Sequence, residues 1–125
     1  MIVRLIGGLL LLLVCLFPKY AFAGYATAEQ LLTSCTNTSN EKDPVRTIVN
    51  PFHCLGYIDG VIDAHELLSA AHLEAKYFCL PPTGLEAGDA MDIVLKYIRD
   101  NPSMMTMPAR LVIIRALNEK YPCKK

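Results

Sequence analysis

The sequence predicts an all-α protein, a small up-down bundle of four to five helices held together by two disulfides. Apolar residues recur at the helical spacings of three and four along most of the chain. No stretch alternates between apolar and polar residues for long enough to form a β-strand. An even number of cysteines follows the apolar N-terminal segment, which favours a disulfide framework. These four are Cys35, Cys54, Cys79 and Cys123.

The first 23 residues have the pattern of a signal peptide. Leu5 to Phe17 is an uncharged run of thirteen residues, whereas a membrane-spanning helix needs about 20. Ala21 and Ala23 supply the small side chains that signal peptidase requires. We therefore predict export to the periplasm with cleavage after Ala23. Cleavage after Ala26 and an uncleaved anchor are the alternatives.

The predicted mature chain, residues 24–125, is a single domain. It carries ten Lys/Arg and twelve Asp/Glu residues, a net charge of about −2. This balance provides no basic surface for nucleic acid and no polybasic stretch for an acidic membrane. We therefore expect no nucleic-acid partner and no stable membrane insertion after cleavage. A domain of this size buries a modest core, so covalent crosslinks add useful stability.

A first helix is predicted to begin at Thr27. Thr27 and Gln30 match the capping box, in which each side chain accepts a hydrogen bond from the backbone N–H of the other residue. The polar residues 36–43 (TNTSNEKD) end this helix. Residues 37–49 are predicted to form a connection on the surface.

A second helix is predicted from Asn50, its N-cap, to about Lys76, with Pro51 at the first helical position, where the missing N–H costs nothing. Gly56 and Gly60 share one face of this helix, although each costs about 1 kcal/mol relative to alanine. We therefore predict that another helix approaches closely there. The apolar stripe consists of Cys54, Ile58, Val61, His65, Leu68 and His72.

The third helix follows the break at Pro81-Pro82. Thr83 and Glu86 match a second capping box, and Asn101 precedes the proline that ends the helix. Its predicted core residues are Leu85, Met91, Val94, Leu95 and Ile98.

The fourth helix is predicted to begin near Met107-Pro108 and to end at Tyr121, before a further proline. Its predicted core residues are Leu111, Ile114 and Leu117.

Four cysteines allow three pairings. Their gaps of 19, 25 and 44 residues lack the C-x-x-C spacing of zinc and haem sites. In an up-down bundle, the end of the first helix and the start of the second lie at one end of the bundle. This placement pairs Cys35 with Cys54. Cys79 and Cys123 follow helices at the opposite end, so we predict that they pair, and we expect neither metal nor cofactor.

Two groups of residues in the second helix could carry chemistry. His65 and His72 lie seven residues apart on one helical face, but no third ligand for a metal is evident. Asp59, Asp63 and Glu66 form a row of carboxylates. Such a row could perform acid–base chemistry or contact a basic partner, and a solvated helix face is the alternative. No catalytic residues are predicted.

The turn at residues 103–107 is a second candidate contact surface. Met104, Met105 and Met107 form a flexible apolar cluster there, and methionines adapt well to partner surfaces. The alternative is that they cap the end of the core.

Five segments carry a resemblance to a known family. They are 54–64 (CLGYIDGVIDA), 78–82 (FCLPP), 92–102 (DIVLKYIRDNP), 107–110 (MPAR) and 121–123 (YPC). Together, and in this order around the cysteines, they resemble the type VI amidase-immunity family, also described as Tai-like or resistance-associated immunity proteins. The resemblance covers roughly Cys35 to Cys123.

The resemblance implies a periplasmic helical protein, often a homodimer, that is not an enzyme. Such proteins bind and block peptidoglycan amidases that are delivered by type VI secretion, which an occluding surface would achieve by keeping substrate out of the cleft. The family's toxin-contacting positions do not align with a motif here. We expect the contacts on the side of Asp59, Asp63 and Glu66 first, and at Met104 and Met105 second.

A small periplasmic chaperone of the acid-activated kind is the alternative function. Such chaperones are also helical and disulfide-bonded, and they expose apolar surface when their carboxylates are protonated. Tight binding of one amidase at neutral pH would distinguish an immunity protein from this alternative.

Overall fold

The structure is a computed structural model that describes residues 25, 27–36, 42, 44–72 and 76–124. The predicted signal peptide and most of the 37–43 connection lie outside these residues. The described chain forms four α-helices and one short 3-10 helix, and within it the only β-type contact is an isolated bridge between Thr27 and Pro108. The predicted all-α fold is confirmed. The elements are α2 (Ala28–Thr36), α3 (Pro44–Ala70), α4 (Ala87–Asp100), η1 (Pro102–Met104) and α5 (Ala109–Lys120).

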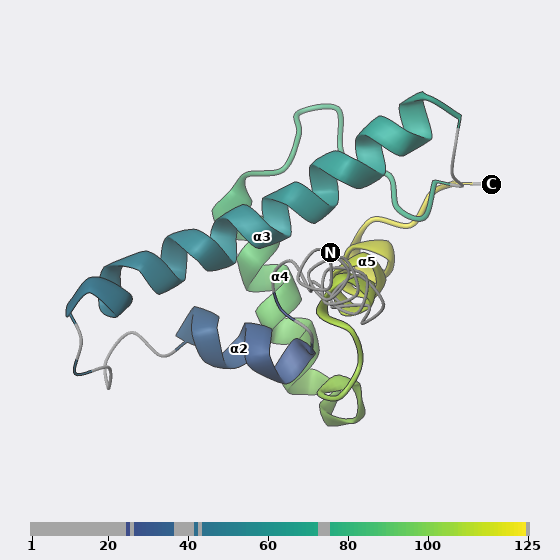
Figure 1. Cartoon of the computed structure of the whole chain (residues 1–125). Helices are drawn as coiled ribbons and strands as arrows, with labels where there is room; N and C mark the ends of the chain where they lie inside the picture. Colours follow the sequence, from purple (N-terminus) through teal and green to yellow (C-terminus); the bar gives the residue numbers. More distant parts are fainter. Residues whose placement is uncertain (1–24, 26, 37–41, 43, 73–75, 125) are drawn as a thin grey trace, which may run out of the picture.

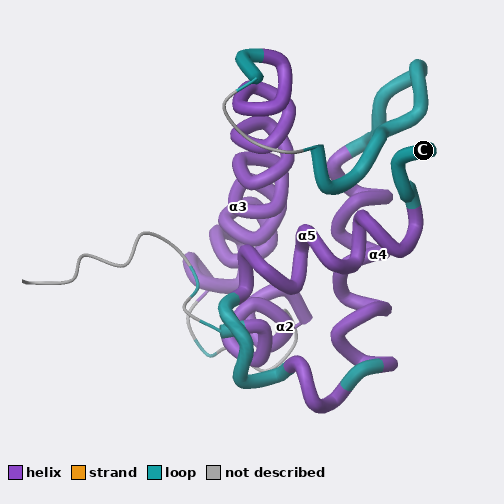
Figure 2. The backbone as a smooth tube through the Cα atoms, turned by 90° about the vertical axis from the view of Figure 1, so that its right-hand side faces the viewer, coloured by secondary structure: helices purple, strands orange, loops and turns teal. Residues whose placement is uncertain are grey.

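Helix α3 is the longest element and runs along one side of the molecule (Figures 1 and 2). Helices α2, α4 and α5 all pack on the same inner face of α3 and on one another. The core therefore lies between α3 and the other three helices. Its largest fully buried side chains are Phe78, Leu31, Ile58, Ile98, Ile113 and Leu117.

The predicted capping box at the start of α2 is confirmed. The backbone N–H of Thr27 donates to Oε1 of Gln30 at 3.4 Å, and the N–H of Gln30 donates to Oγ1 of Thr27 at 3.3 Å. Leu31 and Cys35 then lie buried on one face of the helix.

The predicted boundaries of the second helix are wrong at both ends. Helix α3 begins at Pro44 and continues through Pro51, so residues 44–49 are helical and not a surface connection. Pro44 occupies the start of the helix, a position that proline favours. Pro51 lies inside the helix, where a proline costs about 3 kcal/mol. The helix ends at Ala70, six residues before the predicted end, because the backbone turns left-handed at His72 (φ 56°).

The prediction that another helix of this chain approaches Gly56 and Gly60 is also wrong. Both glycines are exposed. Apart from the backbone of α3 itself, no described atom lies within 4 Å of the place where a Cβ would stand on either residue. These two positions therefore weaken the helix without allowing a closer contact inside the described chain.

Helices α4 and α5 occupy the predicted regions, with two corrections. Helix α4 begins after Glu86, whose side chain makes no capping hydrogen bond. The predicted capping box of Thr83 and Glu86 is therefore wrong. Thr83 instead belongs to a separate turn, in which Gly84 has a φ of 80°. In α5 only Leu117 of the predicted stripe is fully buried, while Leu111 and Ile114 are half-buried. The helix is apolar on several sides, so periodicity alone did not identify the inner face. Its buried residues are Ala109, Val112, Ile113, Ala116 and Leu117.

Both predicted disulfides are confirmed. Cys35 at the end of α2 is bonded to Cys54 in α3, with Cα atoms 5.4 Å apart. Cys79 is bonded to Cys123 after α5, with Cα atoms 4.9 Å apart. The bonds join residues that are 19 and 44 positions apart. In the chain-entropy description they contribute about 3 and about 4 kcal/mol, respectively.

Removal of either disulfide tests this contribution. We expect Cys79→Ala with Cys123→Ala to lower the free energy of unfolding by about 4 kcal/mol, and Cys35→Ala with Cys54→Ala to lower it by about 3 kcal/mol. Urea unfolding followed by circular dichroism measures both. Losses below about 1 kcal/mol for both double variants would contradict the prediction.

Candidate functional site

The candidate site is a surface of α3, because this helix has one buried and one open side. Cys54, Ile58, Ile62 and His65 form the buried side. Seven positions on the opposite side follow one another at spacings of 4, 3, 4, 4, 3 and 4 residues, close to the 3.6-residue turn of the helix. We call them the outer face of α3. They are Val45, Val49, Phe52, Gly56, Gly60, Asp63 and Leu67.

The outer face exposes large apolar side chains at both ends of α3. The exposed fraction is 64% for Val45, 51% for Val49, 72% for Phe52 and 70% for Leu67. Ile48, beside this face, is 63% exposed. Adjacent exposed apolar residues of this kind mark surfaces that bind other proteins. The outer face therefore has the composition of a protein-binding surface.

The predicted row of carboxylates divides into two parts. Asp59 and Asp63 are exposed, and in the described chain neither forms an ion pair. Glu66 is half-buried, and its Oε2 lies 3.4 Å from Nζ of Lys76. Asp59 and Glu66 lie along one edge of the outer face, which we call the acidic edge.

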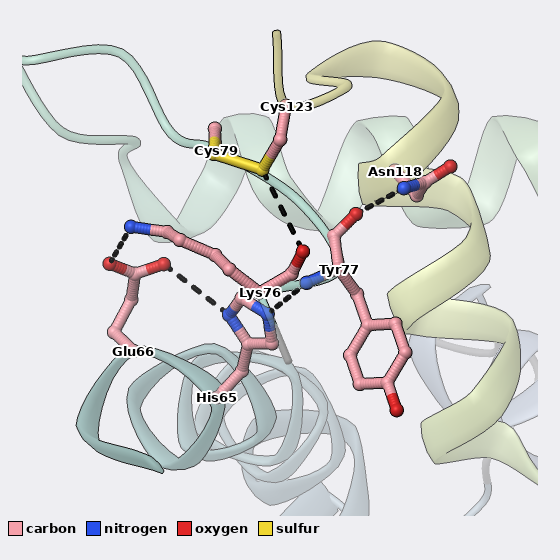
Figure 3. Close-up of polar contacts among 7 residues, drawn as sticks. All are labelled: His65, Glu66, Lys76, Tyr77, Cys79, Asn118 and Cys123. Atoms are coloured by element: carbon pink, nitrogen blue, oxygen red, sulfur yellow. Dashed lines mark hydrogen bonds and ion pairs between the residues drawn. A yellow bond between two sulfur atoms is a disulfide. The ribbon is translucent and has the colours of Figure 1, made fainter. Parts of the chain in front are cut away.

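Glu66 and His65 hold the 76–79 segment against α3 (Figure 3). Nε2 of His65 accepts a hydrogen bond from the backbone N–H of Tyr77 at 3.0 Å. The ring of His65 stacks on buried Phe78, with ring centroids 3.8 Å apart. Since Nε2 is an acceptor, the neutral ring carries its proton on Nδ1. Nδ1 lies 3.3 Å from Oε1 of Glu66, within ion-pair distance but without hydrogen-bond geometry.

The far side of the 76–79 segment is held by α5 and the residues after it. The side chain of Asn118 donates a hydrogen bond to the carbonyl of Tyr77, and the N–H of Cys79 donates to the carbonyl of Tyr121 at 2.9 Å. The sulfur of Cys123 lies 3.8 Å from the carbonyl of Lys76 (Figure 3), a van der Waals contact because a disulfide sulfur carries no hydrogen. The segment is therefore fixed from both sides.

The methionine turn has a structural task that the sequence did not reveal. The carbonyls of Met107 and Met105 accept hydrogen bonds from the N–H groups of Ala28 and Glu29, at 2.9 and 3.0 Å. These donors are the first two amides of α2, which have no partner inside the helix. The side chains of Met104 and Met105 are half-buried and pack against the core. The turn thus caps α2 and covers the end of the core.

A largely apolar groove runs along the edge of the outer face that lies opposite the acidic edge. Its volume is about 450 Å³. Burial raises the pKa of Tyr57 in this groove, and the positive charge of Arg110 partly offsets the effect. The lining residues are Gly56, Tyr57, Gly60, Val61, Ala64, His65, Leu68, Tyr77, Arg110 and Ile114.

The histidines do not come together. His65 is buried under the 76–79 segment, while His72 is exposed beyond the end of α3. His53 is exposed, and its Nδ1 lies 3.0 Å from the hydroxyl of Tyr25. Among the described residues, no three His, Cys, Asp or Glu side chains are grouped so that they could hold a metal ion.

A family model for Rap1a immunity proteins matches residues 27–123, a range that contains all four helices and both disulfides. The chain belongs to the Rap1a immunity protein family. No curated protein and no solved structure matches the chain. In the described part of the chain, no helix is both long and apolar enough to cross a membrane.

Membership of the Rap1a family confirms the coarser part of the sequence prediction. The chain is an immunity protein of the type VI secretion kind, whose partner is a cognate effector protein. The sequence prediction was narrower, because it named amidases as the effectors.

Sequence reasoning missed the apolar outer face of this Rap1a-family chain. A signal was present, since Val45, Val49 and Phe52 follow the helical spacings of four and three. The predicted helix start at Pro51 broke this pattern and placed two of its three residues in a loop.

The hydrogen bond from Tyr77 to His65 can be tested by substitution. We expect His65→Leu to lower the free energy of unfolding by about 1–3 kcal/mol, because the Tyr77 N–H loses its acceptor. Hydrogen exchange at the Tyr77 amide, measured by NMR, should become faster. His72→Asn is the control, since asparagine tolerates the left-handed backbone there. Unchanged protection of the Tyr77 amide in His65→Leu would contradict the prediction.

Proposed function

We propose that this Rap1a-family chain is a periplasmic immunity protein that binds a peptidoglycan amidase delivered by type VI secretion and occludes its active site. The observation that carries the proposal is the family match over residues 27–123. The five segments around the cysteines that resemble the type VI amidase-immunity family lie in the described part of the chain. This resemblance supports the choice of an amidase as the effector.

The proposed location follows from the N-terminal segment and the disulfides. Residues 1–23 have the sequence of a signal peptide, with cleavage after Ala23. Disulfides persist in oxidising compartments such as the periplasm. A protein that protects against a peptidoglycan-cleaving toxin also has to act where the peptidoglycan lies.

Occlusion requires a surface that keeps its shape. Ordering a flexible segment on binding costs free energy, which a preorganised surface avoids. Here the disulfides fix α3 to α2 and fix the 76–79 segment to the end of the chain. This rigidity would keep the shape of the surface that contacts the effector.

We place the effector contact on the acidic edge of α3 and, second, on the methionine turn. Asp59 is fully available because it is exposed, whereas Glu66 is shared with Lys76. An acidic edge fits a basic rim around the effector's cleft and speeds association with it. Met104 and Met105 remain partly accessible, so they can contribute apolar contacts. A second copy of the chain is a further proposed partner.

The proposal predicts that the exported, disulfide-bonded chain neutralises its amidase. The probe is a small Cys–His amidase encoded next to this chain's gene. We expect the two proteins to co-purify, and an equimolar amount of this chain to stop peptidoglycan cleavage. Unchanged cleavage at a stoichiometric excess contradicts the proposal for that pair. Suppressed aggregation of unrelated proteins at acidic pH, without amidase inhibition, would support the chaperone alternative.

Charge reversal on the acidic edge tests the contact. We expect Asp59→Lys to weaken amidase binding by about tenfold, mainly through slower association, because it opposes a basic partner surface. Binding kinetics at low and high salt measure the effect, which should shrink as salt screens the charges. Asp92→Lys is the matched control, since Asp92 is an exposed carboxylate on a different helix, α4, and is not among the buried residues of that helix. Equal effects of the two substitutions would overturn this assignment.

A further inference from the structure

We infer that the apolar groove between α3 and α5 receives one face of a short amphipathic helix of the effector, with an acidic side chain of that helix paired to Arg110. This inference deepens the proposed function and rests on it, because the partner is the effector. The groove and the acidic edge lie on opposite edges of α3, so the two contacts use different residues.

The size of the groove is the first step of the argument. Its lining follows α3 from Gly56 to Leu68, and residues of α5 together with Tyr77 complete it. Twelve residues of helix extend over about 18 Å, the length of a helix of about three turns. Such a helix, 10–12 Å wide, occupies roughly 1,500 Å³ or more, whereas the groove holds about 450 Å³. The groove therefore accepts the side chains along one face of a helix and not the whole helix.

The open side of the groove is the second step. Gly56 and Gly60 lie on the side of the outer face, where open space surrounds the place of each missing Cβ. A small apolar ligand would remain in contact with water there, whereas small-molecule sites bury about 70–90% of a ligand's surface. An amphipathic helix instead presents its polar face to the open side and its apolar face to the groove.

Charge is the third step. No Asp or Glu lines the groove, and within the described chain Arg110 forms no ion pair. The hydroxyl of Tyr57 already donates to the carbonyl of Tyr25, at 3.2 Å. The exposed guanidinium of Arg110 is therefore available to an anionic group. A carboxylate suits it well, because the two groups can form two parallel hydrogen bonds.

The tyrosines of the groove are fixed before a partner arrives. The ring of Tyr57 packs edge-on against Tyr25, with ring centroids 5.2 Å apart. The backbone of Tyr77 is held by His65 through its N–H and by Asn118 through its carbonyl (Figure 3). Tyrosine and arginine are enriched among the residues that contribute most to protein–protein binding. Because these tyrosines need little ordering, the groove is a preorganised site.

The charge also favours the effector over a second copy as the occupant. The longest exposed apolar stripe of this chain is the start of α3, with Val45, Val49 and Phe52. Residues 44–53 contain no Asp or Glu. This stripe of a second copy would therefore bring no carboxylate to Arg110.

Filling the groove tests the inference. We expect Gly60→Gln to raise the dissociation constant for the amidase of the proposed function by about tenfold or more, because the new side chain occupies space that the effector's helix needs. The melting temperature should not fall, since glutamine favours the helix. Apart from the backbone of α3, no described atom lies within 4 Å of the added Cβ. The two measurements separate lost docking from lost folding.

Gly88→Gln is the matched control, because Gly88 is also an exposed helical glycine with open space around it, on α4 and outside the groove. It should bind the amidase as the wild-type chain does.

Reversing the charge of Arg110 tests the predicted ion pair. We expect Arg110→Glu to raise the same dissociation constant by about tenfold, because it places a carboxylate against the effector's carboxylate. Arg110→Lys keeps the charge but not the paired hydrogen bonds, so its effect should be smaller. Arg99→Glu is the control, since Arg99 is exposed on α4 and does not line the groove.

The possible outcomes distinguish this inference from the proposed function. A wild-type chain that does not bind the amidase overturns both for that effector. A wild-type chain that binds it, with Gly60→Gln and Arg110→Glu binding equally well, overturns the inference alone. The inference is also wrong if Gly60→Gln converts a dimer into monomers in sedimentation without effector and leaves amidase binding unchanged. The occupant is then a second copy.

Discussion

Helix α3 is attached to the rest of the protein at two places on its inner side. Close to its middle, Cys54 is bonded to Cys35 of α2. Near its end, His65 accepts the N–H of Tyr77 and stacks on Phe78, which precedes the second disulfide. Between these points Ile58 and Ile62 are buried. Both attachments use the same side of the helix. On the opposite side, the described positions from Phe52 to Leu67 are exposed.

These attachments explain how α3 tolerates residues that weaken helices. It contains one interior proline and two interior glycines, which together cost about 5 kcal/mol in helix propensity. Burial of the inner face and the two crosslinks offset that cost. The glycines lie on the exposed side, where an alanine would raise stability without any clash.

The sequence predicted those parts of the fold that depend on local signals. The capping box at Thr27 and both disulfides followed from residue type and spacing, and both were confirmed. Residue type and spacing did not predict the start of α3. Pro44 and Pro51 each fit the first position of a helix, and only the tertiary structure selects between them. The apparent capping box at Thr83 failed because Gly84 forms a turn there.

The candidate site was less predictable, because its parts depend on contacts between distant segments. Asp59, Asp63 and Glu66 share a helix, yet only Glu66 meets Lys76, through a loop whose path the sequence does not reveal. The methionine turn contacts α2 through backbone carbonyls, and carbonyls are present at every residue. Periodicity could reveal the outer face of α3, but only once the helix had been extended through Pro51.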